Sequence, residues 1–145
     1  MQSIIVIILI GLVGGVAVGI QAPLSSMISQ RLGIMESVFI VHLGGAIAAL
    51  IPLLYYGGGK LSQWRTIPWY ALCAGVFGLV VIFSMSYMIP RIGVATALII
   101  LLAGQLFIGT VLDHFGLLGA AVRPLDLTRV FGLAVVLAGV WISVK

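Results

Sequence analysis

The sequence predicts an all-α membrane protein with five transmembrane helices in one chain. The 145 residues are 63% hydrophobic and only 7% charged, and the mean hydropathy is +1.35. The charged side chains fall in short gaps between long apolar stretches. Because a backbone at membrane depth must satisfy its own N–H and C=O groups, such stretches form membrane-spanning helices.

Each apolar stretch has a length close to the ~20 residues that a helix needs to cross a bilayer. The gaps between them are too short for a folded extramembrane domain, and no internal repeat is recognised. We therefore interpret residues 1–145 as a single integral membrane domain. The first stretch is interpreted as a retained helix, since no Lys or Arg precedes it. The expected spans are residues 3–28, 36–56, 68–88, 93–113 and 127–144.

The first two spans carry small residues that favour close helix packing. Gly11, Gly15 and Gly19 recur every four residues in the first span, and Gly44 and Gly45 lie side by side in the second. Pro23 is expected to bend the first span or to release backbone carbonyls near its end. Residues 30–33 are predicted to close the first hairpin, and the second span is expected to end at residues 57–60.

The remaining spans have recognisable boundaries. Trp64 and Trp69 precede the third span, at the headgroup level that amphipathic rings favour. Pro90 and Arg91 are predicted to form a tight link that makes the third and fourth spans antiparallel neighbours. Asp126 precedes the fifth span and is expected to cap its first turn.

The distribution of positive charge gives little preference for one orientation in the membrane. Lysine and arginine bias between the two faces normally determines orientation. With five spans, four cations share a face with the N-terminus and three lie on the other, so the bias is weak. The chain either inserts both ways and pairs antiparallel with itself, or an unseen partner orients it; we favour the first interpretation. The first set is Lys60, Arg65, Arg123 and Arg129; the second is Arg31, Arg91 and Lys145.

Polar side chains inside the expected spans are candidates for a solute site, because such groups need a polar neighbour or a wet cavity in hydrocarbon. For the amides of Gln21 and Gln105, an interhelical hydrogen bond and a solute contact are equally compatible with the sequence. His42 is either a hydrogen-bonded packing residue or a cavity residue. Ser84 and Ser86 need no special role, because serines bond to their own helix carbonyls. The predicted substrate-binding residues are Gln21, Ser25, His42, Tyr87 and Gln105.

Composition and motifs argue against several other classes. The cations are scattered through the loops, so we expect no nucleic acid partner despite the net charge of +4. No zinc-protease helix motif, nucleophile elbow or phosphate-binding loop occurs, so we expect neither an enzyme nor a resident cofactor. A single Cys and two dispersed His predict no metal site. No acid occupies a mid-membrane position; Asp113 either titrates with His114 or pairs with Arg123 or Arg129.

Several local motifs resemble the YdcZ-type branch of the drug/metabolite transporter superfamily. The likeness covers nearly all five spans and includes the stretch from Gly11 to Gln21. It departs after Gln21, where family members often carry Asn, and around His42, where an aromatic residue is usual. The matching motifs are Leu32-Gly33, Pro90-Arg91-Ile92-Gly93, Ala103-Gly104-Gln105, Asp113-His114-Phe115-Gly116-Leu117, Arg123-Pro124-Leu125, and Arg129 with Gly132 and Gly139.

The resemblance implies a five-helix unit equivalent to half of a ten-helix transporter, paired as an antiparallel homodimer or with a homologous subunit. Our leading hypothesis is a secondary-active transporter of the bacterial inner membrane that moves a small amphiphilic or weakly polar solute by alternating access. The alternatives are a passive channel and a nontransporting scaffold or accessory subunit.

Overall fold

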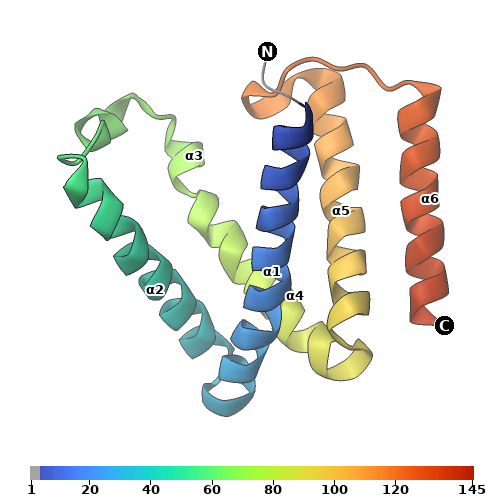
Figure 1. The fold of residues 1–145 in the computed structure, drawn as a ribbon, viewed down its shortest axis with the longest axis horizontal. Coiled ribbons are helices and arrows are strands. Elements are labelled where there is room, and N and C mark those ends of the chain that lie inside the picture. The colour runs from blue at the N-terminus through green and yellow to red at the C-terminus, as the bar shows by residue number, and fades with distance from the viewer. Residues whose placement is uncertain (1–3) are drawn as a thin grey trace. The chain divides into compact units, whose positions relative to one another are not determined.

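The computed structural model describes residues 4–145 and contains five helical segments long and apolar enough to cross a membrane. The expectation of five spans is therefore confirmed. In chain order (Figure 1), they are α1 (Ile4–Leu32), α2 (Ile34–Tyr55), α3 (Trp69–Leu72) together with α4 (Ala74–Ile92), α5 (Val94–Phe115) and α6 (Leu127–Val144).

Two of the links are shorter than the sequence predicts. Helix α1 continues through Gln30 and Arg31 to Leu32, and α4 continues through Pro90 and Arg91 to Ile92. The helix breaks are single glycines, Gly33 and Gly93, with φ of 117° and 81° and ψ of 161° and 166°. Since this backbone region is open essentially to glycine alone, each glycine ends the helix before it, and α4 continues through Pro90.

Two longer links contain short 3₁₀ helices. Residues 56–60 follow α2 and lead into η1 (Leu61–Thr66), and η2 (Leu117–Gly119) follows α5. Gly116 caps α5 in the left-handed conformation. Asp126 caps α6 as expected, because its carboxylate accepts a hydrogen bond of 2.8 Å from the backbone N–H of Arg129.

The internal contacts of the chain divide it into two compact units, residues 1–90 and 91–145. In the first unit, α1 and α2 form a hairpin whose helices meet at the Gly33 end (Figure 1). In the second unit, α5 and α6 lie side by side and are joined by residues 116–126.

One buried serine of α2 bonds to α1 across the hairpin, and further hydrogen bonds beside it lie within α1. The hydroxyl of Ser37, which is 0% exposed, donates to the backbone carbonyl of Ser25 at 2.8 Å. The hydroxyl of Ser25 donates within α1 to the carbonyl of Ala22 at 2.9 Å. The amide of Gln30 donates to the hydroxyl of Ser26 at 3.1 Å. Small polar side chains therefore let the two backbones approach closely while their own hydrogen bonds are satisfied.

The segments around the two single-glycine links share one pattern of burial, which sequence inspection missed. Residues 31–34 read Arg-Leu-Gly-Ile and residues 91–94 read Arg-Ile-Gly-Val. Four pairs of buried residues flank these motifs, and the residue numbers differ by 60 in every pair. The pairs are Ala22 and Ile82, Ser25 and Met85, Ser26 and Ser86, and Ser37 and Ala97.

The second link lacks the hydroxyl and amide contacts of the first. Ala97 stands where Ser37 donates, and Pro90 stands where Gln30 donates. The hydroxyl of Ser86 is consequently buried without a hydrogen-bond partner among the described residues. The expected bond to a carbonyl of the same helix is confirmed for Ser84, whose hydroxyl donates to Val80 at 2.9 Å. It is wrong for Ser86.

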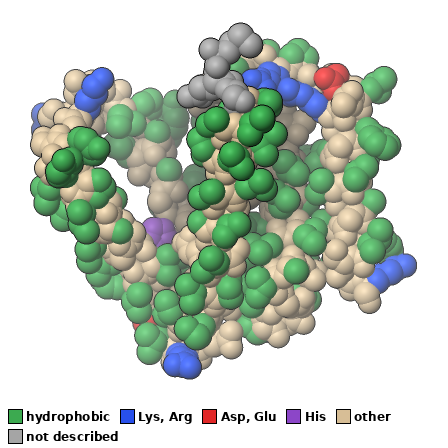
Figure 2. Space-filling model, in the orientation of Figure 1, with side chains coloured by type: hydrophobic (Ala, Val, Ile, Leu, Met, Phe, Trp, Pro, Cys, Tyr) green, Lys and Arg blue, Asp and Glu red, His purple; other side chains and the backbone are tan. Residues whose placement is uncertain are grey.

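Most apolar side chains of the spans lie on the surface of the chain. Figure 2 shows hydrophobic side chains over the helices, with Lys and Arg gathered at the helix ends. Among the described residues, the buried hydrophobic side chains are Ala22, Ile82, Met85, Ala97 and Ala103. Such extensive apolar surface is incompatible with a water-exposed monomer and requires lipid or another helix to cover it.

Substitution of either link glycine should destabilise the protein. We expect Gly33→Ala and Gly93→Ala each to cost about 1–3 kcal/mol, because an L side chain is strained at these dihedral angles. A Cβ at Gly33 would also collide with the carboxylate of Glu36. The measurement is reversible unfolding in mixed micelles. Gly15→Ala is the matched control, since no atom lies within 4 Å of a Cβ there; an equal loss in that variant would contradict the prediction.

Candidate solute-binding groove

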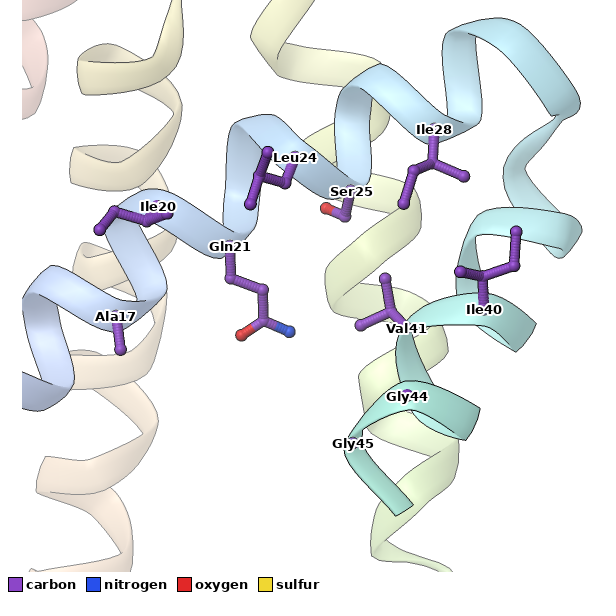
Figure 3. A pocket seen from close by; sticks show the side chains of 10 residues that line it. All are labelled: Ala17, Ile20, Gln21, Leu24, Ser25, Ile28, Ile40, Val41, Gly44 and Gly45. Atoms are coloured by element: carbon purple, nitrogen blue, oxygen red, sulfur yellow. The ribbon is translucent and has the colours of Figure 1, made fainter. Parts of the chain in front are cut away.

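A groove of about 430 Å³ lies between α1 and α2, within the first unit. Its walls are apolar, apart from one amide and one hydroxyl (Figure 3). The lining residues are Ala17, Ile20, Gln21, Leu24, Ser25, Ile28, Ile40, Val41, Gly44 and Gly45.

Small residues leave the space that forms the groove. Gly44 and Gly45 present bare backbone on α2, and a Cβ built on either would have no atom within 4 Å. On α1, Pro23 lies inside the helix beside the groove-lining residues. A proline has no N–H to donate, so the carbonyl one turn earlier, that of Gly19, loses its usual helical hydrogen bond. The groove therefore lies beside a backbone carbonyl that has lost its usual hydrogen bond within α1.

Gln21 is the principal polar group of the groove. Figure 3 shows its amide projecting from α1 on the side that faces α2. Among the described residues, no hydrogen bond to this amide is present. A neutral amide offers two N–H donors and a carbonyl acceptor, so it can orient a polar group of a solute in apolar surroundings.

Ser25 lines the same groove, but its hydroxyl is already engaged within α1. Its side chain is 2% exposed, and its hydroxyl hydrogen is directed to the carbonyl of Ala22. Only the oxygen lone pairs of this hydroxyl are available to a solute, as acceptors. The structure therefore places Gln21 and Ser25 in the same groove. The Gln21 amide can both donate and accept a hydrogen bond, whereas the Ser25 hydroxyl can only accept one.

His42 lies against α4 and is not among the groove-lining residues. Its Nδ1 is 2.8 Å from the carbonyl oxygen of Val38, and because a carbonyl only accepts, Nδ1 carries the hydrogen. The opposite nitrogen, Nε2, faces Gly78, where an added Cβ would lie only 2.5 Å away. The imidazole therefore fills space that a glycine leaves open between α2 and α4.

The other two predicted site residues lie outside this groove. Tyr87 is an exposed residue of α4 in the first unit, and Gln105 is an exposed residue of α5 in the second. Sequence reasoning assigned Gly44 and Gly45 to helix packing and missed that they line a groove. Two adjacent glycines on the helix that follows the polar segment of Gln21 and Ser25 could have indicated open space beside that segment.

A second polar cluster joins the end of α5 to the start of α6. The guanidinium of Arg129 forms an ion pair of 3.6 Å with the carboxylate of Asp113 and donates at 3.2 Å to the carbonyl of Arg123. His114 Nδ1 accepts a hydrogen bond of 3.1 Å from the backbone N–H of Leu125. The expected pairing of Asp113 with an arginine is confirmed, and Arg129 is that arginine.

No group of three metal-ligating side chains occurs within residues 4–145. The five apolar helices and the groove define a multi-pass membrane protein with a polar group facing an apolar recess.

Comparison with known proteins identifies the family and, through it, the functional class. The chain matches, over residues 6–142, the family described as "Putative inner membrane exporter, YdcZ", and it therefore belongs to that family. At this coarse level, the family membership supports a membrane transport protein. No curated protein and no solved structure matches the chain.

The contact between His42 and Gly78 can be tested by a double-mutant cycle. We expect Gly78→Ala to cost about 1–3 kcal/mol through overpacking. This cost should disappear in the His42→Ala background, because the two residues then no longer compete for space. The measurement is unfolding free energy in mixed micelles. Gly75→Ala is the control, as a Cβ there meets no atom within 4 Å; an unchanged cost in the double variant would show that the contact is absent.

Proposed function

We propose that this protein is one subunit of a secondary-active transporter in the bacterial inner membrane. It would move a small amphiphilic or weakly polar solute by alternating access in an antiparallel dimer. Membership of an exporter family supports transport in general. The observation that carries the proposal is the α1–α2 groove, where one neutral amide and one hydroxyl lie in an otherwise apolar recess.

The dimensions and chemistry of the groove suit a small amphiphile. Its volume of about 430 Å³ falls in the range of roughly 300–1,000 Å³ that is usual for small-molecule sites. No charged side chain lines it, so a strongly charged ion would lose its hydration without compensation. A solute with an apolar body and one or two hydrogen-bonding groups matches the walls and the Gln21 amide.

Pairing with a second, inverted copy is supported by charge and by surface. With four cations on one face and three on the other, the charge distribution opposes neither orientation of the chain in the membrane. The spans expose many large apolar side chains that a second copy could cover. An inverted pair would also supply the ten helices implied by the family resemblance. Rocking of the two copies would then open a central cavity to alternate faces.

Removal of either intramembrane amide should impair transport. The measurement is uptake and counterflow of radiolabelled chloramphenicol, a neutral amphiphilic probe, in proteoliposomes. We expect Gln21→Ala to slow saturable uptake about tenfold, the effect of losing one hydrogen bond of about 1.4 kcal/mol. Gln105→Ala should reduce transport more than it reduces dimer yield. Gln63→Ala, in η1 outside the groove, is the control.

The same assay separates the rival functions. Saturation with counterflow supports a carrier. Single-channel current, or flux that does not saturate, would indicate a passive channel instead. Loss of dimer without loss of transport per dimer in Gln105→Ala would assign that amide to assembly. Absence of flux and binding, with one co-purifying protein, would indicate a scaffold or accessory subunit.

The orientation of the chain provides an independent test. Tags at both ends, probed with impermeant reagents in inside-out and right-side-out vesicles, should each be reached from both faces in a mixed population. Addition of two lysines beside Lys145 should shift the population towards one orientation, because positive charge is retained on the cytoplasmic side. A single orientation in the unmodified chain would contradict self-pairing and require a homologous subunit of opposite orientation.

A further inference from the structure

A second groove, distinct from the candidate solute site, lies between α5 and α6. It has a volume of about 280 Å³ and combines an ion pair with apolar walls. All of its residues belong to the second unit. They are Leu106, Thr110, Asp113, Arg129, Gly132 and Leu133.

The groove has a charged end and an apolar end. Asp113 lies two residues before the end of α5, and Arg129 lies in the first turn of α6. Both helices are long and apolar enough to span the membrane, so these charges lie at the headgroup level. Leu106 lies about two turns, or roughly 10 Å, from Asp113 towards the start of α5, which places it at acyl-chain depth. The groove therefore runs from the membrane interface into the hydrocarbon.

Both members of the ion pair can still form hydrogen bonds to a ligand. Its atoms are 3.6 Å apart, and the side chains of Arg129 and Asp113 are 34% and 42% exposed. The hydrogen bond to the carbonyl of Arg123 uses one guanidinium nitrogen, Nη1, the same nitrogen that faces Asp113. The other guanidinium N–H groups can donate to an anion, and the carboxylate can accept from a cation.

The walls leave room for an alkyl chain below the charges. Gly132 has no side chain, and a Cβ built there meets no atom within 4 Å. The hydroxyl of Thr110 donates to the carbonyl of Leu106 at 2.7 Å, so its hydrogen is satisfied within α5. An acyl chain can therefore lie along Leu106, Gly132 and Leu133 without covering an unsatisfied donor.

We propose that this groove is a binding site for a phospholipid whose headgroup carries both a phosphate and a primary ammonium, that is, a phosphatidylethanolamine. The phosphate binds the guanidinium of Arg129, the ammonium donates to the carboxylate of Asp113, and one acyl chain occupies the apolar end. A phosphatidylglycerol offers no cation to Asp113, and the trimethylammonium of a phosphatidylcholine has no N–H to donate. The headgroup charges thus select among lipids that share the same chains.

The experiment uses the full-length protein, delipidated in detergent and titrated with dioctanoyl phosphatidylethanolamine, phosphatidylcholine or phosphatidylglycerol. Bound lipid is counted by native mass spectrometry. The ethanolamine lipid should bind most tightly. We expect Arg129→Gln to weaken its binding about tenfold. Asp113→Asn should abolish the preference for ethanolamine over choline.

Two glycine variants test the apolar end without altering the charges. Gly132→Leu places a side chain in the groove and should weaken binding of the ethanolamine lipid about tenfold. Gly139→Leu is the matched control: it lies two turns further along α6, also meets no atom within 4 Å, and is outside the groove. Arg65→Gln, a cation in η1 expected on the same membrane face, controls for general charge.

Several outcomes would overturn the proposal. Equal binding of the three lipids, or equal losses in Gly132→Leu and Gly139→Leu, would exclude a specific lipid site. Competition by free phosphoethanolamine at the same concentrations as the lipid would assign the site to a soluble phosphate compound. Disruption of the dimer by Gly132→Leu but not by Gly139→Leu, without lipid binding in the unmodified protein, would assign the groove to a second copy.

Discussion

The absence of water at membrane depth is the constraint on which the structure depends. Every backbone polar group there needs a protein partner, which makes the five spans helical and confines irregular backbone to their ends. The same constraint acts on side chains. The hydroxyl of Ser37 finds the Ser25 carbonyl across the hairpin, and most other membrane serines and threonines bond to a carbonyl of their own helix. Polar groups that have no such partner therefore stand out as candidates for binding.

Glycine serves three different physical roles in this chain. At Gly33 and Gly93 it provides backbone dihedrals that other residues rarely adopt, and it thereby sets where helices end. At Gly78 it admits an imidazole that any side chain would displace. At Gly44, Gly45 and Gly132 it leaves open space beside a helix. The same residue type thus produces a link, a close contact or a groove, depending on its backbone dihedral angles and on what lies opposite it.

The two grooves differ in ways that match different ligands. The α1–α2 groove has no charge and presents the Gln21 amide, which suits a solute that must be released again. The α5–α6 groove ends in an ion pair at the depth of the headgroups, which suits a lipid that remains bound. Strong interactions at a transport site would slow release, whereas strong interactions at a lipid site stabilise the folded protein by preferential binding. Under the two proposals made above, the uncharged groove would bind the transported solute and the charged groove would bind a lipid.

The sequence by itself determined the number of spans, the membrane class and the Asp126 cap. Its motifs indicated the family, and it left the pairing of Asp113 with an arginine as one of two alternatives. These follow from hydropathy, helix-end chemistry and local motifs, which act over a few residues. Only the tertiary structure decided that the links are Gly33 and Gly93, and that Gln21 and Ser25 share a groove while His42 faces Gly78. It also showed that the Ser86 hydroxyl has no hydrogen-bond partner among residues 4–145. Whether a polar side chain meets a groove, a carbonyl or a glycine depends on helix rotation and on the neighbouring helix. Periodicity cannot supply that information when nearly every position is apolar.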